Sequence, residues 1–170
     1  METKRSVKSP AELARKIVGL LSEKKKTITF AESCTGGLIA STLVSVPGSS
    51  AVFDGSLVTY ANRIKHDYLG VSESTLEKDG AVSSSCAEQM AEGARRAIDA
   101  DYAVAVTGIA GPGGGSPEKP VGLVYIAVAA RGEKTEVFRF IFEGGRTAVR
   151  RATCRQALCE LYCRISKENE

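Results

Sequence analysis

The sequence predicts one α/β domain over residues 1–170, a three-layer α/β/α sandwich around a mixed, mostly parallel sheet of about five strands. Short apolar segments that fit strands alternate with amphipathic segments that fit helices, which is the pattern of a sheet covered on both faces. The last two apolar segments instead follow each other across Arg131-Gly132, a tight turn that favours an antiparallel hairpin. The length fits a single domain with a core of its own. Strand order does not follow from these patterns.

The first half of the chain divides into three helices and two strands. We place helices over 11–24, 36–46 and 62–69, and strands over 27–31 and 53–60. The first helix begins at Ser9 with Glu12 three residues later, which is the spacing of a capping box. The second helix stops at Pro47, and the third is closed by Gly70.

The second half adds two helices and three strands. Helices are expected over 85–99 and 147–166, and strands over 102–107, 121–130 and 134–142. Ser85 and Glu88 have capping-box spacing at the start of the first of these helices. The strand over 102–107, YAVAVT, is apolar throughout, as expected of a strand covered on both faces.

Composition and charge limit the possible partners. Hydrophobic residues make up 43% and charged residues 25%, which is ordinary for a globular protein, and the net charge of +3 does not demand a nucleic acid. No apolar run reaches the roughly 20 residues that span a bilayer, and the charged start lacks the apolar region of a secretory signal. Five cysteines, an odd number, fit reduced thiols. We expect a cytoplasmic protein without nucleic-acid or membrane partners, and we also expect a homo-oligomer.

The residue inventory argues against a metal site. His66 is the only histidine, so two-histidine metal motifs are impossible. The cysteines include no CxxC pair and lack zinc spacing. Cys159 and Cys163 lie four residues apart, which more often reflects packing on one helix face than ligation. We expect no metal and no cofactor.

The first candidate site segment is AESCTGG, residues 31–37, directly after the first predicted strand. Ligands gather at the carboxyl ends of strands in open α/β sheets. A serine on such a turn, here Ser33, can act as a nucleophile whose oxyanion is stabilised by backbone amides. The alternative is that Ser33 and Thr35 only cap the following helix.

The second candidate segment is TYANRIK, residues 59–65. Asn62 and Lys65 are three apart and share a helix face, whereas His66 points about 100° away from Lys65. Lysine can serve as a base only when neutral, which requires its pKa to fall from about 10.4 to nearer 7–8. The commoner fate of a single lysine is a solvated surface position.

The third candidate segment is the glycine loop TGIAGPGGGSP, residues 107–117, after the most apolar strand. It fits neither the dinucleotide fingerprint nor the P-loop, yet successive glycine amides can surround an anion. Arg146, after two glycines, can reach a phosphate with two hydrogen bonds. For Arg150, Arg151 and Arg155 we expect a solvated basic face.

Together these segments resemble the CinA carboxy-terminal domain family. The resemblance covers 31–71 and 80–129, AESCTGG and TGIAGPGGG lie in the family's order and spacing, and GGRTAVRRATCRQAL echoes its closing arginine helix. It implies a nicotinamide-nucleotide amidase, which converts nicotinamide mononucleotide and water into nicotinate mononucleotide and ammonia in pyridine-nucleotide salvage. Longer relatives carry an amino-terminal domain similar to molybdopterin-binding proteins, so this chain looks like the stand-alone form. Gly145 stands where the family often has aspartate.

The resemblance also implies roles for individual residues. Ser33 attacks the carboxamide carbon, and Lys65 accepts its proton and later passes one to departing ammonia. The amides around Thr35, Gly36 and Gly37 form the oxyanion hole. Tyr60 bonds Lys65 or Ser33, and Thr107 does the same from the next strand end. The remaining positions bind the nucleotide: Asn62 at ribose or base, and Gly108, Ala110, Gly111, Gly113 and Arg146 at the phosphate.

Three alternatives stay open. Cys34 is a rival nucleophile, because thiols attack more readily than hydroxyls. A non-enzymatic nucleotide-binding module linked to competence would use the same loops, with Lys65 as an ordinary charged contact. A nucleic-acid binder using the terminal arginines would show a steep salt dependence, but the net charge gives it little support.

Overall fold

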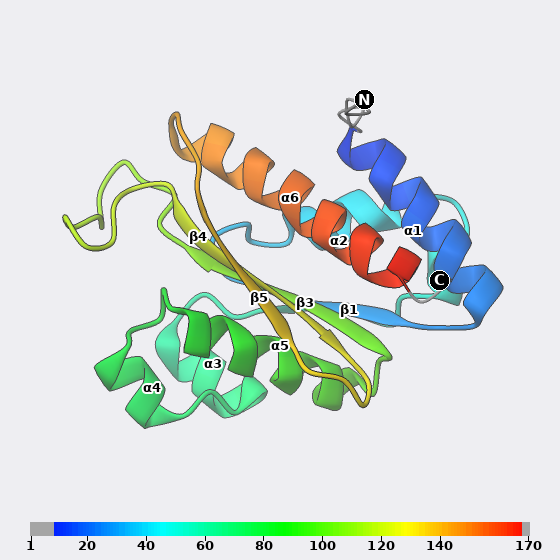
Figure 1. Ribbon diagram of the computed structural model, residues 1–170, viewed down its shortest axis with the longest axis horizontal. Helices are drawn as coiled ribbons and strands as arrows, with labels where there is room; N and C mark the ends of the chain where they lie inside the picture. Colours follow the sequence, from blue (N-terminus) through cyan, green and yellow to red (C-terminus); the bar gives the residue numbers. More distant parts are fainter. Residues whose placement is uncertain (1–8, 168–170) are drawn as a thin grey trace.

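Five strands form one sheet, and helices cover both of its faces (Figure 1). The structure, a computed structural model, describes residues 9–167. The strands are β1 (Ile28–Glu32), β2 (Leu57–Val58), β3 (Tyr102–Gly108), β4 (Leu123–Ala130) and β5 (Glu136–Ile141). The helices are α1 (Pro10–Lys24), α2 (Leu38–Val44), α3 (Asn62–Leu69), α4 (Glu73–Lys78), α5 (Ser84–Ile98) and α6 (Arg146–Lys167), with a short 3-10 turn, η1, over Ser49–Ala51. The predicted three-layer sandwich is confirmed.

The strand order is β2-β1-β3-β4-β5. β1 pairs in parallel with β2 and with β3, whereas β4 is antiparallel to both β3 and β5. All strands except β4 therefore run in one direction, which confirms the mixed, mostly parallel sheet and its closing hairpin. Because β1 and β3 are parallel neighbours, the segments that follow them leave the sheet at the same edge.

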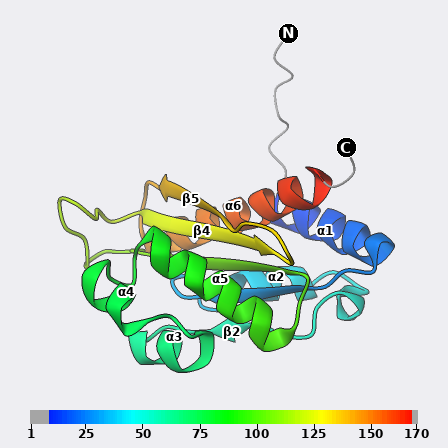
Figure 2. The ribbon, with the colours of Figure 1, turned by 60° about the horizontal axis from the view of Figure 1, so that its bottom comes forward.

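The two faces of the sheet carry side chains of different size. Toward α5 the strands present alanines at Ala31, Ala103, Ala105, Ala127 and Ala129. Toward α1, α2 and α6 they present larger side chains at Ile28, Phe30, Tyr102, Val104, Val106, Ile126 and Val128. The small side chains let α5 lie close along the sheet, with α3 and α4 beside it (Figure 2).

Four predicted elements are shorter than expected: the strands predicted over 121–130 and 134–142 are trimmed at their ends to Leu123–Ala130 and Glu136–Ile141, and two others change more. The strand predicted over 53–60 is reduced to Leu57–Val58, because Asp54 and Gly55 interrupt it with residues that disfavour strands. The helix predicted from residue 36 begins at Leu38 instead, because Gly36 and Gly37 adopt left-handed φ angles of 59° and 95°.

The helix caps only partly follow the predictions. The Ser9 hydroxyl accepts the amide of Glu12 at 3.2 Å, as the capping box predicts. The Ser85 capping box is wrong, because α5 is capped two residues earlier, where the Ser83 hydroxyl accepts the amide of Cys86. The short helix α4, capped by Ser72, was not predicted.

Helix α3 is held against α5 by a contact that only glycine permits. A Cβ built on Gly93 of α5 would lie 1.9 Å from the carbonyl oxygen of Leu69 in α3. Real side-chain atoms do not approach a backbone oxygen this closely, so the two helices need glycine at this position. The contact matters for function because α3 carries Lys65.

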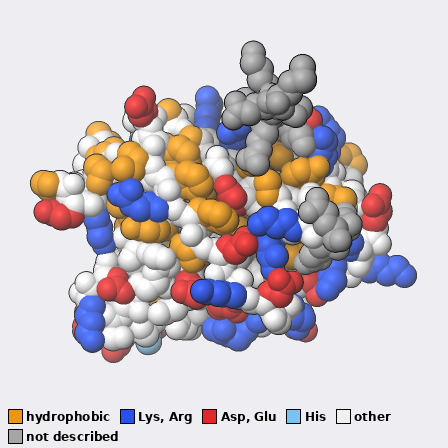
Figure 3. Space-filling view, viewed as in Figure 1, with side chains coloured by type: hydrophobic (Ala, Val, Ile, Leu, Met, Phe, Trp, Pro, Cys, Tyr) orange, Lys and Arg blue, Asp and Glu red, His pale blue; other side chains and the backbone are white. Residues whose placement is uncertain are grey.

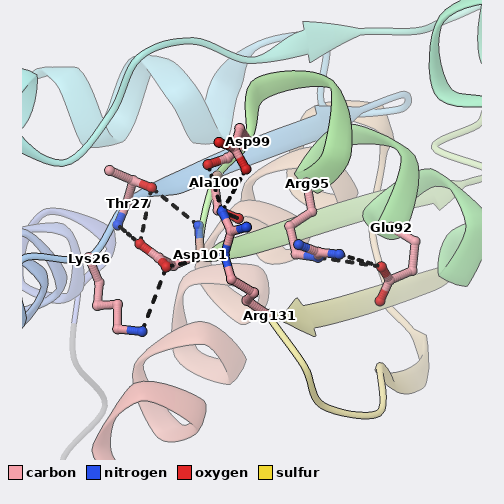
Figure 4. Close-up of polar contacts among 8 residues, drawn as sticks. All are labelled: Lys26, Thr27, Glu92, Arg95, Asp99, Ala100, Asp101 and Arg131. Carbon is pink, nitrogen blue, oxygen red and sulfur yellow. Dashed lines mark hydrogen bonds and ion pairs between the residues drawn. The ribbon is translucent and has the colours of Figure 1, made fainter.

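A polar network joins the strands at the end of the sheet where β1 and β3 begin (Figure 4). The Asp101 carboxylate, just before β3, accepts the amide of Thr27 at 2.9 Å, and the Thr27 hydroxyl accepts the amide of Asp101 at 3.2 Å. Lys26 and Arg131 form ion pairs with the same carboxylate. This network joins the starts of β1 and β3 to the β4–β5 turn.

Within residues 9–167, no helix combines the length and the apolar character that a membrane crossing requires.

Candidate active site

A pocket of about 280 Å³ opens where β1 and β3 end. Its lining comprises Ser33, Cys34, Tyr60, Asn62, Lys65, Ala81, Val82, Thr107, Gly108, Ile109, Ala110, Gly111, Gly113, Gly114 and Arg146. Ten of the thirteen site residues named from the sequence lie in this set. The exceptions are Thr35, Gly36 and Gly37.

Ser33 and Lys65 meet inside this pocket. Lys65 Nζ lies 3.2 Å from Ser33 Oγ and donates to the carbonyl oxygens of Thr59 at 2.8 Å and Tyr60 at 3.0 Å. A neutral amine has two N–H bonds and one lone pair. The two carbonyls accept the N–H bonds, which leaves the lone pair for the Ser33 hydroxyl. The arrangement therefore suits a lysine that takes a proton from serine.

Burial favours the neutral form of this amine. Lys65 is 1% exposed, and burial lowers the pKa of its ammonium group. The neighbouring thiols of Cys86 and Cys34 oppose this shift only as secondary effects. No carboxylate in residues 9–167 forms an ion pair with Lys65 that would restore its charge. The alternative that Lys65 is a solvated surface lysine is therefore wrong.

His66 is directed elsewhere, as its place on the helix predicts. Its Nδ1 lies 2.8 Å from the carbonyl oxygen of Val71, and its ring lines a separate hollow beside α4. It does not reach Ser33, so Lys65 is the base that the geometry offers.

The turn that carries Ser33 is fastened from two sides. The Ser33 amide donates to the Val106 carbonyl of β3 at 3.1 Å. From α6, Arg150 donates through Nε to the carbonyl of Cys34 at 3.1 Å and through Nη2 to that of Thr35 at 2.6 Å. The solvated face expected for Arg150 is therefore wrong, and this arginine positions the turn.

The oxyanion hole expected around residues 35–37 needs correction at Gly36 and Gly37, whereas no backbone carbonyl within residues 9–167 accepts the amide of Thr35. The buried carboxylate of Glu32 occupies the amino end of α2, where it accepts the amides of Gly37, Ile39 and Ala40 at 2.8–3.1 Å. The amide of Gly36 donates to the Ser33 carbonyl. Neither glycine amide is left for a substrate. Within residues 9–167, no backbone carbonyl accepts the amide of Cys34, which is in the pocket lining.

The thiol of Cys34 is poorly suited to attack. Its residue is 5% exposed, and burial raises the pKa of the thiol to about 11, with a smaller contribution from the charge of Glu32. A thiol with this pKa is almost entirely protonated near neutral pH, and the thiolate is the reactive form. The geometry therefore favours Ser33 over Cys34.

Tyr60 and Arg146 join the two sides of the pocket mouth. Arg146 donates through Nη2 to the Tyr60 hydroxyl and through Nη1 to the Gly111 carbonyl, both at 3.0 Å. The expected contact of the Tyr60 side chain with Lys65 or Ser33 is wrong, because only the Tyr60 carbonyl reaches Lys65. Tyr60 is 61% exposed.

Thr107 also differs from the expectation. Its hydroxyl donates to the carbonyl of Ala81 at 2.7 Å, so it ties β3 to the segment before α5 rather than bonding the serine–lysine pair. Asn62 lines the pocket from the first turn of α3, with an exposed side chain.

Some glycines of the loop after β3 serve packing. A Cβ on Gly108 would lie 2.6 Å from the side chain of Val124. A Cβ on Gly111, whose φ is 82°, would lie 2.6 Å from the side chain of Val121. Gly113 has open space around it. A Cβ on Gly115 would lie 2.8 Å from the backbone nitrogen of Val121, so the loop combines three glycines required by close approach with at least one that leaves room for a ligand.

Sequence reasoning missed Glu32, Ala81 and Val82, and misjudged Arg150. Glu32 had a signal, because an acid just before a helix is favoured at the positive end of its dipole. Arg150 had none, since nothing in its neighbours indicates the loop it contacts. Within the described residues, no three histidine, cysteine, aspartate or glutamate side chains gather as a metal site would require.

The fold and the site define a class: α/β sandwich proteins with a buried serine–lysine pair at the carboxyl edge of a mixed sheet. Residues 10–165 match the family described as CinA C-terminal domain, and the chain belongs to that family.

Relatives of known sequence support the same family membership. A CinA-like protein of Leptospira borgpetersenii serovar Hardjo-bovis (strain L550) is 45% identical over 167 residues, which are 98% of this chain and 40% of that protein. A CinA-like protein of Endomicrobium trichonymphae is 54% identical over 139 residues, which are 82% of this chain and 32% of that protein. This chain thus spans less than half the length of either relative.

Solved structures match over nearly their whole length. The competence/damage inducible protein CihA from Agrobacterium tumefaciens is 48% identical with a TM-score of 0.89, covering 96% of this chain and 98% of its own. A CinA superfamily protein from Klebsiella pneumoniae is 33% identical with a TM-score of 0.90, covering 94% and 99%.

Proposed function

We propose that this protein is a nicotinamide-nucleotide amidase, which hydrolyses nicotinamide mononucleotide to nicotinate mononucleotide and ammonia. The observation that supports this best is the buried Lys65 amine, 3.2 Å from the Ser33 hydroxyl in a pocket with an arginine at its mouth. Nucleophile and base within hydrogen-bond reach, with the base oriented by further groups, are the general signature of an activated nucleophile.

The first half of the reaction forms an ester on Ser33. Ser33 Oγ attacks the carboxamide carbon while Lys65 Nζ takes the hydroxyl proton, which gives a tetrahedral oxyanion. The amide of Cys34, beside the nucleophile, is the candidate oxyanion donor. Lys65 then passes its proton to the carboxamide nitrogen, the carbon–nitrogen bond breaks, and ammonia leaves.

The second half releases the acid. Water attacks the ester carbon while Lys65, again neutral, takes a proton from the water. The carbon–oxygen bond to Ser33 breaks, the proton returns from Lys65 to Ser33 Oγ, and nicotinate mononucleotide leaves. Lys65 ends each half-reaction as it began, neutral and bonded to the two carbonyls.

The nucleotide part is assigned to the other side of the pocket. Arg146 and the glycine loop, with Gly108, Ala110, Gly111 and Gly113, bind the phosphate, and Asn62 contacts ribose or base. Arg146 already holds the Gly111 carbonyl, so loop and guanidinium form one surface. Guanidinium and backbone amides are both suited to a phosphate.

Ammonia release tests the proposal. Nicotinamide mononucleotide, nicotinamide riboside and free nicotinamide are compared with the unmodified protein, and we expect turnover of the mononucleotide with loss of efficiency when phosphate is absent. Ser33→Ala is expected to abolish turnover, whereas Cys34→Ala, the matched control, retains it. A fully active Ser33→Ala protein would exclude Ser33 as nucleophile.

The same experiment separates an enzyme from a regulatory nucleotide-binding module. Lys65→Ala is expected to bind nicotinamide mononucleotide without releasing ammonia. If the unmodified protein also binds without turnover, the module is favoured and the amidase is rejected.

A further inference from the structure

Residues 109–122 form the glycine-rich loop that connects β3 to β4, and this loop projects from the left side of the molecule (Figures 1 and 3). Two of its glycines, Gly113 and Gly114, are exposed and line the pocket. In the proposed function the loop binds the phosphate of the substrate. It must therefore keep a fixed place relative to Ser33, because small displacements of a binding group lose much of its effect.

The returning half of the loop is a compact unit. Ser116 donates its amide to the Lys119 carbonyl at 2.8 Å, and the Ser116 hydroxyl accepts the Lys119 amide at 3.1 Å. Gly115 lies so close to Val121 that no side chain fits between them. A contact that holds Lys119 therefore also holds the glycines before it.

The side chain of Lys119 leaves the loop and reaches the connection between α4 and α5. Its Nζ donates to the carbonyl oxygen of Asp79 at 2.5 Å. A Cβ built on Gly80 would lie 3.2 Å from the same Nζ, so the ammonium lies directly over this connection. A hydrogen bond from an ionised donor is stronger than one between neutral groups.

The segment that receives Lys119 is itself held in place. The Ser83 hydroxyl donates to the Gly80 carbonyl at 2.8 Å. The next carbonyl, that of Ala81, accepts the Thr107 hydroxyl at 2.7 Å, which joins the segment to β3. The connection between α4 and α5 is thus a fixed point to which the loop can be anchored.

The glycine loop is anchored on two sides. On one side Arg146 donates to the Gly111 carbonyl and to the Tyr60 hydroxyl, and on the other Lys119 donates to Asp79. We propose that Lys119 is a positioning residue that fixes the glycine loop for the phosphate of the substrate, an assignment that rests on the proposed function. Lys119 is not in the pocket lining, so it acts through the loop.

Amide hydrogen exchange, measured by NMR, tests the anchor independently of activity. Lys119→Met keeps an unbranched side chain but removes the donor, so the Ser116 amide is expected to exchange about three- to tenfold faster than in the unmodified protein. Lys119→Arg retains a charged donor and is expected to recover most of the protection. Lys78→Met, at an exposed neighbour of Asp79, makes the same charge change and leaves the exchange unaltered.

The kinetics of ammonia release test whether the anchor serves the phosphate. In Lys119→Met, the KM of nicotinamide mononucleotide is expected to rise about three- to tenfold with kcat nearly unchanged, because the phosphate is bound alike in the ground state and the transition state. Nicotinamide riboside, which lacks the phosphate, is expected to be affected less. Lys119→Arg should recover the KM, and Lys78→Met should keep it.

Circular dichroism establishes that the three variants are folded. Exchange of the Ser116 amide that is unchanged in Lys119→Met would overturn the proposal. So would equal losses with mononucleotide and riboside, or a Lys78→Met protein that behaves like Lys119→Met. Absence of ammonia release from the unmodified protein would reject the amidase, and with it the phosphate role, whereas the exchange of Ser116 would still decide whether Lys119 holds the loop.

Discussion

Lys65 is held by carbonyl groups rather than by a carboxylate, and this determines its chemistry. A carboxylate partner would favour the ammonium form, whereas burial lowers the pKa of Lys65. The carbonyls of Thr59 and Tyr60 orient the amine without adding a full negative charge. The chain thus offers a base at Ser33 although its only histidine points elsewhere.

The first prediction concerns pH. Because the neutral amine is the active form, kcat/KM is expected to fall as pH drops below the lowered pKa of Lys65 and to level off above it. A pH profile of ammonia release measures this limb. A rate that is independent of pH across the acidic and neutral range would contradict a lysine base.

Folding stability gives an independent check on the same group. Between the folded pKa of Lys65 and its ordinary value of 10.5, the unfolded chain binds more protons than the folded chain, so stability rises with pH there. Lys65→Met removes this titration. Relative to Lys65→Met, the unmodified protein should therefore gain stability as pH rises toward 10.5 in denaturant unfolding. A difference that stays constant with pH would mean that the pKa is not lowered.

The second prediction concerns Arg150, which holds the turn of Ser33 without lining the pocket. Loss of two charge-assisted hydrogen bonds loosens the nucleophile, so Arg150→Ala is expected to lower kcat by about tenfold with less change in KM. Arg151→Ala, an exposed neighbour on the same helix, is the matched control. Equal effects of the two variants would show that helix charge, not the turn, is responsible.

At the scale of elements, the position of α3 depends on its contact with α5. Lys65 reaches Ser33 only because α3 lies where Gly93 allows Leu69 to approach. The alanine-lined face of the sheet brings α5 close, and α5 in turn positions α3. Two successive packing contacts, of α5 on the sheet and of α3 on α5, therefore set the position of Lys65.

The third prediction compares two glycines inside helices. Gly93→Ala forces a Cβ against the Leu69 carbonyl and is expected to destabilise the fold by about 1–3 kcal/mol and to lower activity. Gly19→Ala in α1 meets nothing within 4 Å and is expected to stabilise by about 0.5–1 kcal/mol. Thermal and denaturant unfolding measure both changes. Similar effects in the two variants would reject the close contact between α3 and α5.

At the scale of the whole molecule, the candidate catalytic residues and the Asp101 network that joins the strands lie at opposite ends of β1 and β3. The serine–lysine pair is at the carboxyl ends of β1 and β3, and the Asp101 network is at their starts. Stability and catalysis should therefore respond separately to changes at the two ends.

The fourth prediction tests this separation. Asp101→Ala removes the acceptor of the Thr27 amide and is expected to destabilise the protein by about 1–3 kcal/mol while leaving kcat/KM unchanged. Asp54→Ala, at an exposed position, is the control for loss of an acidic side chain. Loss of kcat/KM in folded Asp101→Ala would show that the two ends are coupled.

Sequence alone was enough for most helices, the closing hairpin and the sandwich. Helix α3 lies over 62–69 as predicted, because the residues that form and stop it, Asn62 to Gly70, are neighbours in the chain. The motif resemblance also brought Ser33 and Lys65 together before their distance was known. The interrupted strand at Asp54 and the late start of α2 show where local patterns mislead.

Only the tertiary structure decided which groups are free to act. The Gly37 amide is occupied by Glu32, the Tyr60 phenol by Arg146 and the Thr107 hydroxyl by Ala81. Arg150 reaches Cys34 across 116 residues of chain. Such contacts join segments distant in sequence, and periodicity describes only residues a few positions apart. Strand order and packing bring them together, so their partners, and the burial that lowers the pKa of Lys65, follow from the folded chain.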